Sequence, residues 1–182
     1  MELFVETSLS DLYLAIIKNN KIIDKICEKD LVKKTDEFYL KLNLLFERNK
    51  IDIDSINEIY ITLGPGSFSG ARIGLLFART ICQISNKKLF IVPTYKLFEM
   101  QKKILKQDFN QIKIKANKYN NYLIKLNSNF SCELVENNND FDKFDYQLFE
   151  KKLPKYKNIF MQCLDVDEVE LLYLHEPQIG GK

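Results

Sequence analysis

Residues 64–70 of the chain are Gly64-Pro65-Gly66-Ser67-Phe68-Ser69-Gly70, and ARIGLLFARTICQI follows them at 71–84. The glycines permit positive φ and close backbone approach, and Ser67 or Ser69 can cap a helix that begins near Gly70. The expected helix, from about Gly70 to Ile84, is apolar around most of its circumference. Such a helix is buried on two sides, so one side should face a sheet and the other a second helix or a partner.

Small residues recur along this helix at four-residue spacing, at Gly70, Gly74 and Ala78. A glycine inside a helix costs about 1 kcal/mol relative to alanine, so close packing at Gly74 should compensate. Small residues also let another helix approach closely. We therefore expect this ridge to be available to another helix.

The loop has a second interpretation, as a phosphate site, because the N-terminus of a helix presents free N–H groups to anions. Its spacing fits neither G-x-x-x-x-G-K-[ST] nor G-x-G-x-x-G, and it contains no lysine. A tight connection between a strand and a helix has at least equal weight.

Hydrophobic periodicity and turn residues divide the rest of the chain. Thr35 or Asp36 should cap the first helix, and Thr94 should cap the third. Strands are expected at 3–5, 12–17, 22–26, 59–63, 89–92, 112–116, 122–126, 130–135 and 158–161, and helices at 33–48, 70–84 and 94–106. The first three strands form an antiparallel meander, and those flanking the central helix should pair in parallel through a right-handed crossover. This order predicts an α/β fold, with a mixed sheet covered by helices.

Composition excludes several kinds of chemistry. The 182 residues carry a net charge of +2 and a single histidine, so a two-histidine zinc site cannot form. That residue, His175, is expected to face solvent in a polar C-terminal segment. The four cysteines show no C-x-x-C pattern, and the first residues lack a basic n-region and a long apolar run, so no signal peptide is expected. We expect reduced thiols, a buried Cys82, a cytoplasmic location and no membrane partner.

Three motifs resemble one known family. Gly64-Pro65-Gly66-Ser67-Phe68-Ser69-Gly70-Ala71-Arg72-Ile73-Gly74 is similar to the G-P-G-S-F-T-G-L-R-I-G signature of the TsaB (YeaZ) family. Phe4-Val5-Glu6-Thr7-Ser8 resembles its I-D-T-S strand end, and 92–98 resembles its V-S-T-L-x-x-L segment. The resemblance implies the actin-like ATPase (ASKHA) fold. The first lobe would lie at 1–100, and a degenerate, shortened second lobe at 101–182.

The resemblance also implies a non-catalytic scaffold and activator. It would bind TsaD, the subunit that transfers a threonylcarbamoyl group to the adenosine next to the anticodon of tRNA. The ATPase TsaE would join them, tRNA would be contacted only through the complex, and the pairing surface can self-associate as a homodimer. That surface would comprise the two N-terminal-lobe helices. The residues carried over to it are Phe38, Leu42, Leu45, Gly70, Arg72, Ile73, Gly74, Leu76, Phe77 and Ala78. A bulky charged residue at Gly74 or Leu76 should abolish binding of TsaD while the monomer stays folded.

The chain departs from the family at acidic positions. Glu6 replaces an aspartate, and Ala116-Asn117-Lys118 replaces a D-A-R segment. A vestigial nucleotide or phosphate loop would comprise Glu6, Thr7, Ser8, Gly66 and Ser67. No catalytic residue, metal or cofactor is expected for this chain, and ATP or ADP at the interface with the partner is left open.

Two alternatives remain open. One is an ATP-binding phosphotransferase of the same fold, for which Glu6 is the only well-placed carboxylate. The other is direct binding of tRNA by lysines, since Lys102, Lys103 and Lys106 should lie near one another on a helix, and Lys113 and Lys115 should share one face of a strand.

Overall fold

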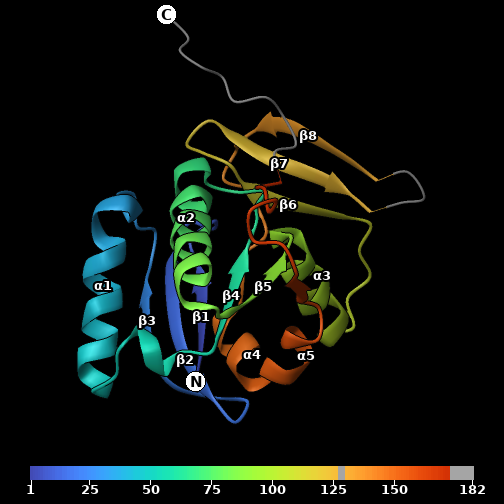
Figure 1. Ribbon diagram of the computed structural model, residues 1–182. Coiled ribbons are helices and arrows are strands. Elements are labelled where there is room, and N and C mark those ends of the chain that lie inside the picture. Colours follow the sequence, from blue (N-terminus) through green and yellow to red (C-terminus); the bar gives the residue numbers. More distant parts are fainter. Residues whose placement is uncertain (127–129, 173–182) are drawn as a thin grey trace, which may run out of the picture.

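A six-stranded mixed sheet lies at the centre of the computed structural model, which describes residues 1–126 and 130–172 (Figure 1). Its strand order is β3-β2-β1-β4-β5-β9. The strands are β1 (Glu2–Glu6), β2 (Leu12–Lys18), β3 (Lys21–Glu28), β4 (Glu58–Thr62), β5 (Lys88–Val92) and β9 (Met161–Cys163). Strands β1, β2 and β3 form the predicted antiparallel meander, and β4 is parallel to both β1 and β5.

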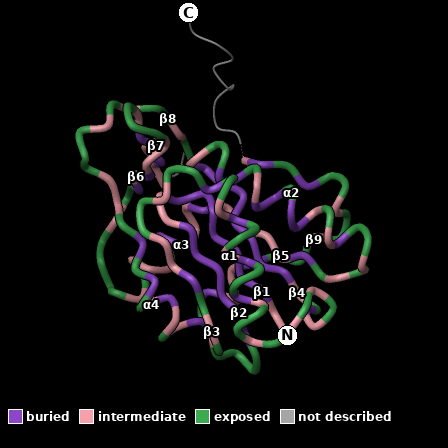
Figure 2. Tube along the Cα trace, turned by 90° about the vertical axis from the view of Figure 1, so that its left-hand side faces the viewer, coloured by how far each residue is buried: buried purple, intermediate pink, exposed green. Residues whose placement is uncertain are grey.

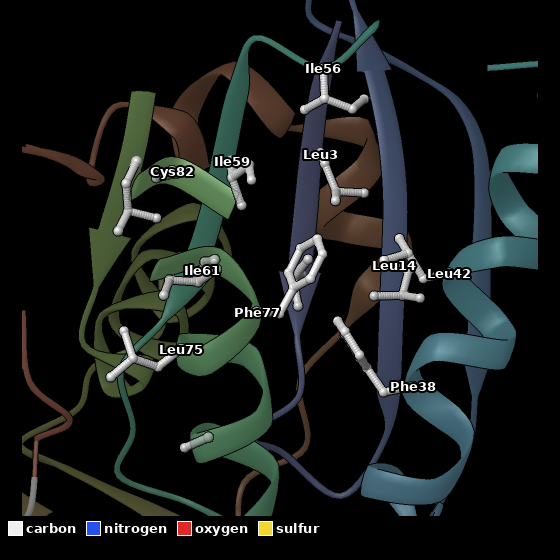
Figure 3. Close-up of a cluster of buried hydrophobic side chains, with 14 of the residues drawn as sticks. Leu3, Leu14, Phe38, Leu42, Ile56, Ile59, Ile61, Leu75, Phe77 and Cys82 are labelled. Carbon is white, nitrogen blue, oxygen red and sulfur yellow. The ribbon is translucent and has the colours of Figure 1, made fainter. Parts of the chain in front are cut away.

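Helices cover both faces of this sheet, which explains why β1, β2 and β4 are almost continuously buried (Figure 2). Helices α1 (Lys34–Asn49) and α2 (Phe68–Ser85) lie side by side on one face. Their core includes Leu3, Leu14, Phe38 and Phe77 (Figure 3). Helix α3 (Thr94–Ile104) packs on the other face, where Phe4 and Tyr13 are buried. The predicted mixed α/β fold is confirmed.

A second, three-stranded antiparallel sheet follows α3. It consists of β6 (Gln111–Lys115), β7 (Asn120–Lys125) and β8 (Ser131–Glu136), in that order across the sheet. These strands agree with the expected ones to within a few residues. Ile112, Ile114 and Ile124 are buried in the same core as α3. The second sheet therefore shares a hydrophobic core with the first sheet and its helices.

The chain then returns to the first sheet through two short helices that the sequence did not predict, α4 (Tyr146–Lys151) and α5 (Leu153–Lys157). The Tyr146 ring stacks on Tyr13 at 4.4 Å between centroids, and Phe149 lies 4.6 Å from Phe4. Strand β9 pairs antiparallel with β5, a few residues later than the strand expected at 158–161. The predicted boundary at residue 100 is therefore wrong for this C-terminal segment, because residues 146–163 complete the first sheet and its core.

The N-termini of the helices differ partly from expectation. Ser67 caps α2 as predicted, since its Oγ accepts a hydrogen bond from the Gly70 N–H at 3.3 Å. Lys33 and Pro93 precede α1 and α3 without side-chain caps. The predicted caps at Thr35, Asp36 and Thr94 are wrong, because these residues already lie within the first turn of each helix.

Two other expectations concern single residues and membranes. Cys82 is buried, as predicted. His175 and its expected solvent-facing position lie outside the described residues. Within 1–126 and 130–172, no helix combines the length and apolar character that crossing a membrane requires.

Candidate functional site

The Gly64–Ser67 loop is held tightly against the end of β1. Gly64 has a φ of +85°, and its carbonyl oxygen accepts a 2.8 Å hydrogen bond from the Thr94 N–H. The Ser67 N–H donates to the Ser8 carbonyl oxygen at 2.6 Å. A Cβ on Gly66 would lie 2.2 Å from that same oxygen, so only glycine fits there. The loop therefore covers the turn that follows β1.

Glu6 lies fully buried beneath this loop. Its Oε1 accepts hydrogen bonds from the Ser8 N–H at 2.6 Å, the Leu9 N–H at 3.0 Å and the Ser8 hydroxyl at 2.7 Å. Ser8 Oγ is also 3.1 Å from Thr62 Oγ1 and 2.8 Å from Thr94 Oγ1. Burial raises the pKa of the Glu6 carboxyl, and these hydrogen bonds oppose that rise.

The end of β1 does not fit a phosphate. The backbone N–H groups that follow this strand, at Ser8 and Leu9, already donate to Glu6. Glu6, Thr7 and Ser8 are at most 2% exposed. The structure brings together the predicted loop residues, but around the protein's own carboxylate. The described part of the chain also lacks any group of three or more side chains placed to hold a metal ion.

A hollow between the two sheets is a second place where a nucleotide could be sought. A hollow of about 350 Å³ there includes Asp11, Lys29 and Asp142 in its lining. Asp11 forms an ion pair with Lys29, and Asp142 forms one with Lys102, both at 2.7 Å. Both of these carboxylates are therefore already paired with lysines, which leaves them poorly suited to bind a metal.

The ridge of small residues on α2 faces β1. A Cβ on Gly70 would lie 2.0 Å from the Thr7 carbonyl oxygen, and one on Gly74 would lie 2.5 Å from Thr7 Oγ1. Ala78 is fully buried. The prediction that this ridge is open to another helix is wrong, because the small residues allow α2 to lie directly on the end of β1.

Most residues predicted to bind a partner belong to the core beneath the two helices. Phe38 and Phe77 meet at 5.2 Å between ring centroids and join α1 to α2. The buried set is Phe38, Leu42, Leu45, Gly70, Gly74, Phe77 and Ala78. The prediction that these seven residues contact a partner is therefore corrected, because they support the two helices from within the core. Arg72 and Leu76 are exposed and Ile73 is half-buried, so these three remain available.

The outward side of the two helices carries large apolar side chains. We call it the α1–α2 face and define it by Tyr39, Leu40 and Leu44 on α1 and by Phe68, Arg72, Ile73, Leu76 and Ile84 on α2. Leu40, Leu76 and Ile84 are 63%, 59% and 75% exposed. Site prediction missed Tyr39, Leu40 and Leu44. The sequence feature that could have identified them is their position outside the main apolar stripe of α1. Apolar residues there are not buried by the chain's own core.

Two hollows flank α2 on this side. One, of about 420 Å³, lies between α2 and α1 and includes Tyr39, Phe46 and Ile81 in its lining. The other, of about 750 Å³, lies between α2 and residues 169–171, with Arg72 and Leu76 in its lining. Grooves beside an apolar ridge are suited to receive side chains of a docked helix.

Arg79 holds the segment that borders the second hollow. Its guanidinium donates to the carbonyl oxygens of Val166, Asp167 and Val169 at 3.0, 2.7 and 2.5 Å. Leu171 is buried against the core, and the Leu172 N–H donates to the Leu63 carbonyl oxygen at 2.9 Å. Arg79 therefore holds one wall of the second hollow in place, and its charge is not free on the α1–α2 face.

Comparisons of sequence place part of the chain beside known proteins. Residues 40–119 match the family model described as TsaD: tRNA N6-adenosine threonylcarbamoyltransferase. The uncharacterized protein MG208 homolog of Mycoplasma pneumoniae is 28% identical over 99 residues, which cover 53% of this chain and 50% of the relative. The uncharacterized protein MG208 of Mycoplasma genitalium is 30% identical over 83 residues, which cover 44% and 42%. The chain thus spans about half the length, or less, of the curated relatives it matches.

Comparisons of structure define the class of fold. A solved structure titled as an uncharacterized protein with similarity to peptidase YeaZ from Pseudomonas aeruginosa has a TM-score of 0.63 at 12% identity, covering 96% of this chain and 99% of that one. YeaZ from Pseudomonas aeruginosa has a TM-score of 0.55 at 14% identity, covering 79% and 70%. The chain has an actin-like ATPase fold, as predicted. Within that class it has the fold of YeaZ, so the resemblance to the TsaB (YeaZ) family is confirmed at the level of the fold.

Proposed function

We propose that this chain is a non-catalytic, TsaB-type subunit that binds and activates a TsaD-type partner in the formation of N6-threonylcarbamoyladenosine next to the anticodon of tRNA. The observation that carries the proposal is the α1–α2 face. It exposes large apolar side chains on two adjacent helices whose inner sides are already fully packed. Apolar groups gathered on one face are typical of a protein–protein interface.

The β1 end supports the non-catalytic part of the proposal. The backbone N–H groups of Ser8 and Leu9 donate hydrogen bonds to Glu6, and the Gly64–Ser67 loop covers them. A phosphotransferase needs an accessible place for the transferred phosphate, so that alternative has less support. Any ATP or ADP in the complex would be held mainly by the partner, and this subunit requires no cofactor.

Three of the five lysines that could contact tRNA lie within 4 Å of a carboxylate of the chain. Lys102 pairs with Asp142 at 2.7 Å and Lys113 with Asp140 at 2.6 Å. Lys103 lies 3.6 Å from Glu99. We therefore propose that tRNA is contacted only through the complex. The subunit would act in the cytoplasm, where the ATPase TsaE joins the assembly, and the same face would pair two copies when the partner is absent.

A reconstituted modification reaction tests this proposal. It contains tRNA, the TsaD-type and TsaE-type proteins of the same organism and an enzyme that supplies threonylcarbamoyl-adenylate. We expect the modified nucleoside, measured by mass spectrometry of digested tRNA, to form only when this chain is added. Equal formation without the chain would contradict the proposed role.

A further inference from the structure

We infer that the partner presents a carboxylate to Arg72, and that this ion pair fixes the orientation of the complex. The inference rests on the proposed function, because it concerns the surface that covers the α1–α2 face. Beyond that function, it specifies which chemical group the partner places opposite one residue of this face.

Arg72 differs from the other two arginines of the chain. Arg48 binds Asp24 through two hydrogen bonds, at 3.1 and 2.6 Å, and Arg79 donates to three carbonyl oxygens. Arg72 is exposed, and its guanidinium lies 4.5 Å from the centroid of the Phe68 ring. In the parts of the chain that the structure describes, it has neither a salt bridge nor a hydrogen-bond acceptor. Its N–H groups are therefore available to a partner.

Docking of a partner at the α1–α2 face would take the guanidinium of Arg72 out of water. Ile73 and Leu76 lie beside it on α2, and it lines the 750 Å³ hollow together with Leu76. A partner that covers Leu76 must therefore also remove the guanidinium from water. Desolvation of an unpaired charge is strongly unfavourable, whereas pairing it with an opposite charge recovers much of that cost.

The geometry favours a carboxylate as the partner group. A guanidinium presents two parallel N–H groups that match the two oxygens of a carboxylate. The contact with the Phe68 ring restricts the orientation of the guanidinium plane, so less freedom is lost on pairing. Glu170 borders the same hollow, yet no ion pair joins it to Arg72 among the described residues.

Titration calorimetry between this chain and the TsaD-type protein of the same organism tests the inference. We expect Arg72→Glu to weaken binding by about 100-fold or more. We expect Arg72→Lys to weaken it by about tenfold, because an ammonium cannot form the bidentate contact. The matched control is Lys155→Glu, which makes the same change in net charge at an exposed position of α5 and should leave the affinity unchanged.

A second step identifies the opposing group. Exposed Asp and Glu residues of the partner are changed to Arg one at a time, and one of these variants should restore binding to Arg72→Glu. The inference is overturned if Arg72→Glu binds as tightly as the wild type, or if no charge reversal restores binding. Loss of tRNA modification with unchanged affinity for the partner would also overturn it, since that result assigns Arg72 to a phosphate of tRNA. Failure of the wild-type chain itself to bind would overturn the proposed function as well, so the two failures are distinguishable.

Discussion

Gly70→Ala is expected to lower the free energy of unfolding by about 3 kcal/mol or more. The new Cβ would lie 2.0 Å from the Thr7 carbonyl oxygen, an atom of the backbone that no rotamer change can move aside. Helix α2 would have to shift away from β1, which loosens the core between them. Urea unfolding followed by circular dichroism measures the change.

The matched control for this prediction is Thr80→Ala, which places the same residue type on the exposed side of α2. It should change the free energy of unfolding by no more than about 0.5 kcal/mol. The same reasoning corrects the expectation for Gly74, where a bulky charged residue should unfold the monomer and not merely block binding. An unchanged urea midpoint for Gly70→Ala would show that α2 does not lie on β1 as described.

Leu76→Glu is expected to weaken binding to the TsaD-type partner by about 100-fold while the monomer remains folded. Leu76 belongs to the α1–α2 face and is 59% exposed, so the monomer loses little packing when it is replaced. The complex would bury an unpaired carboxylate among apolar groups, which is strongly unfavourable. Calorimetric titration measures the affinity, and urea unfolding checks the monomer.

Leu134→Glu is the control for Leu76→Glu. Leu134 is 41% exposed on β8 in the second sheet, so the chemical change is the same at a distant surface. Its affinity for the partner should equal that of the wild type. Equal weakening by both substitutions would mean that charge anywhere on the chain impairs binding, which would remove the support for a specific face.

The first hundred residues were predicted well because their signals are local. Strands β1 to β5 and helices α1 to α3 have clear periodicity, and turn residues such as Asn19 and Asn20, both with positive φ, separate the strands. The helix cap at Ser67 was likewise fixed by nearby sequence. These features depend on residues within a few positions of one another.

The missed features depend on residues far apart in the chain. Helices α4 and α5 are short, and they form because Tyr146 and Phe149 pack on Tyr13 and Phe4. No local sequence pattern predicts that β9 pairs with β5 or that Arg79 forms hydrogen bonds to residues 166–169. Tertiary packing decided these elements.

The candidate site shows the same division. The sequence located the helix that carries the site and correctly required close packing at Gly74. It could not decide which neighbour supplies that packing, because a small-residue ridge fits a strand of the same chain as well as a foreign helix. Burial then separated Leu76 and Arg72, which face outward, from Gly70 and Ala78, which do not.

Covalent labelling of side chains, read by mass spectrometry in the free chain and in the complex with the TsaD-type partner, tests the central claim most directly. We expect Tyr39, Leu40, Leu76 and Ile84 to lose label in the complex, because the partner covers the α1–α2 face. Tyr119 and Leu134, exposed in and beside the second sheet, should keep theirs. Protection confined to Tyr119 and Leu134, with Leu76 still labelled, would contradict the proposed docking surface.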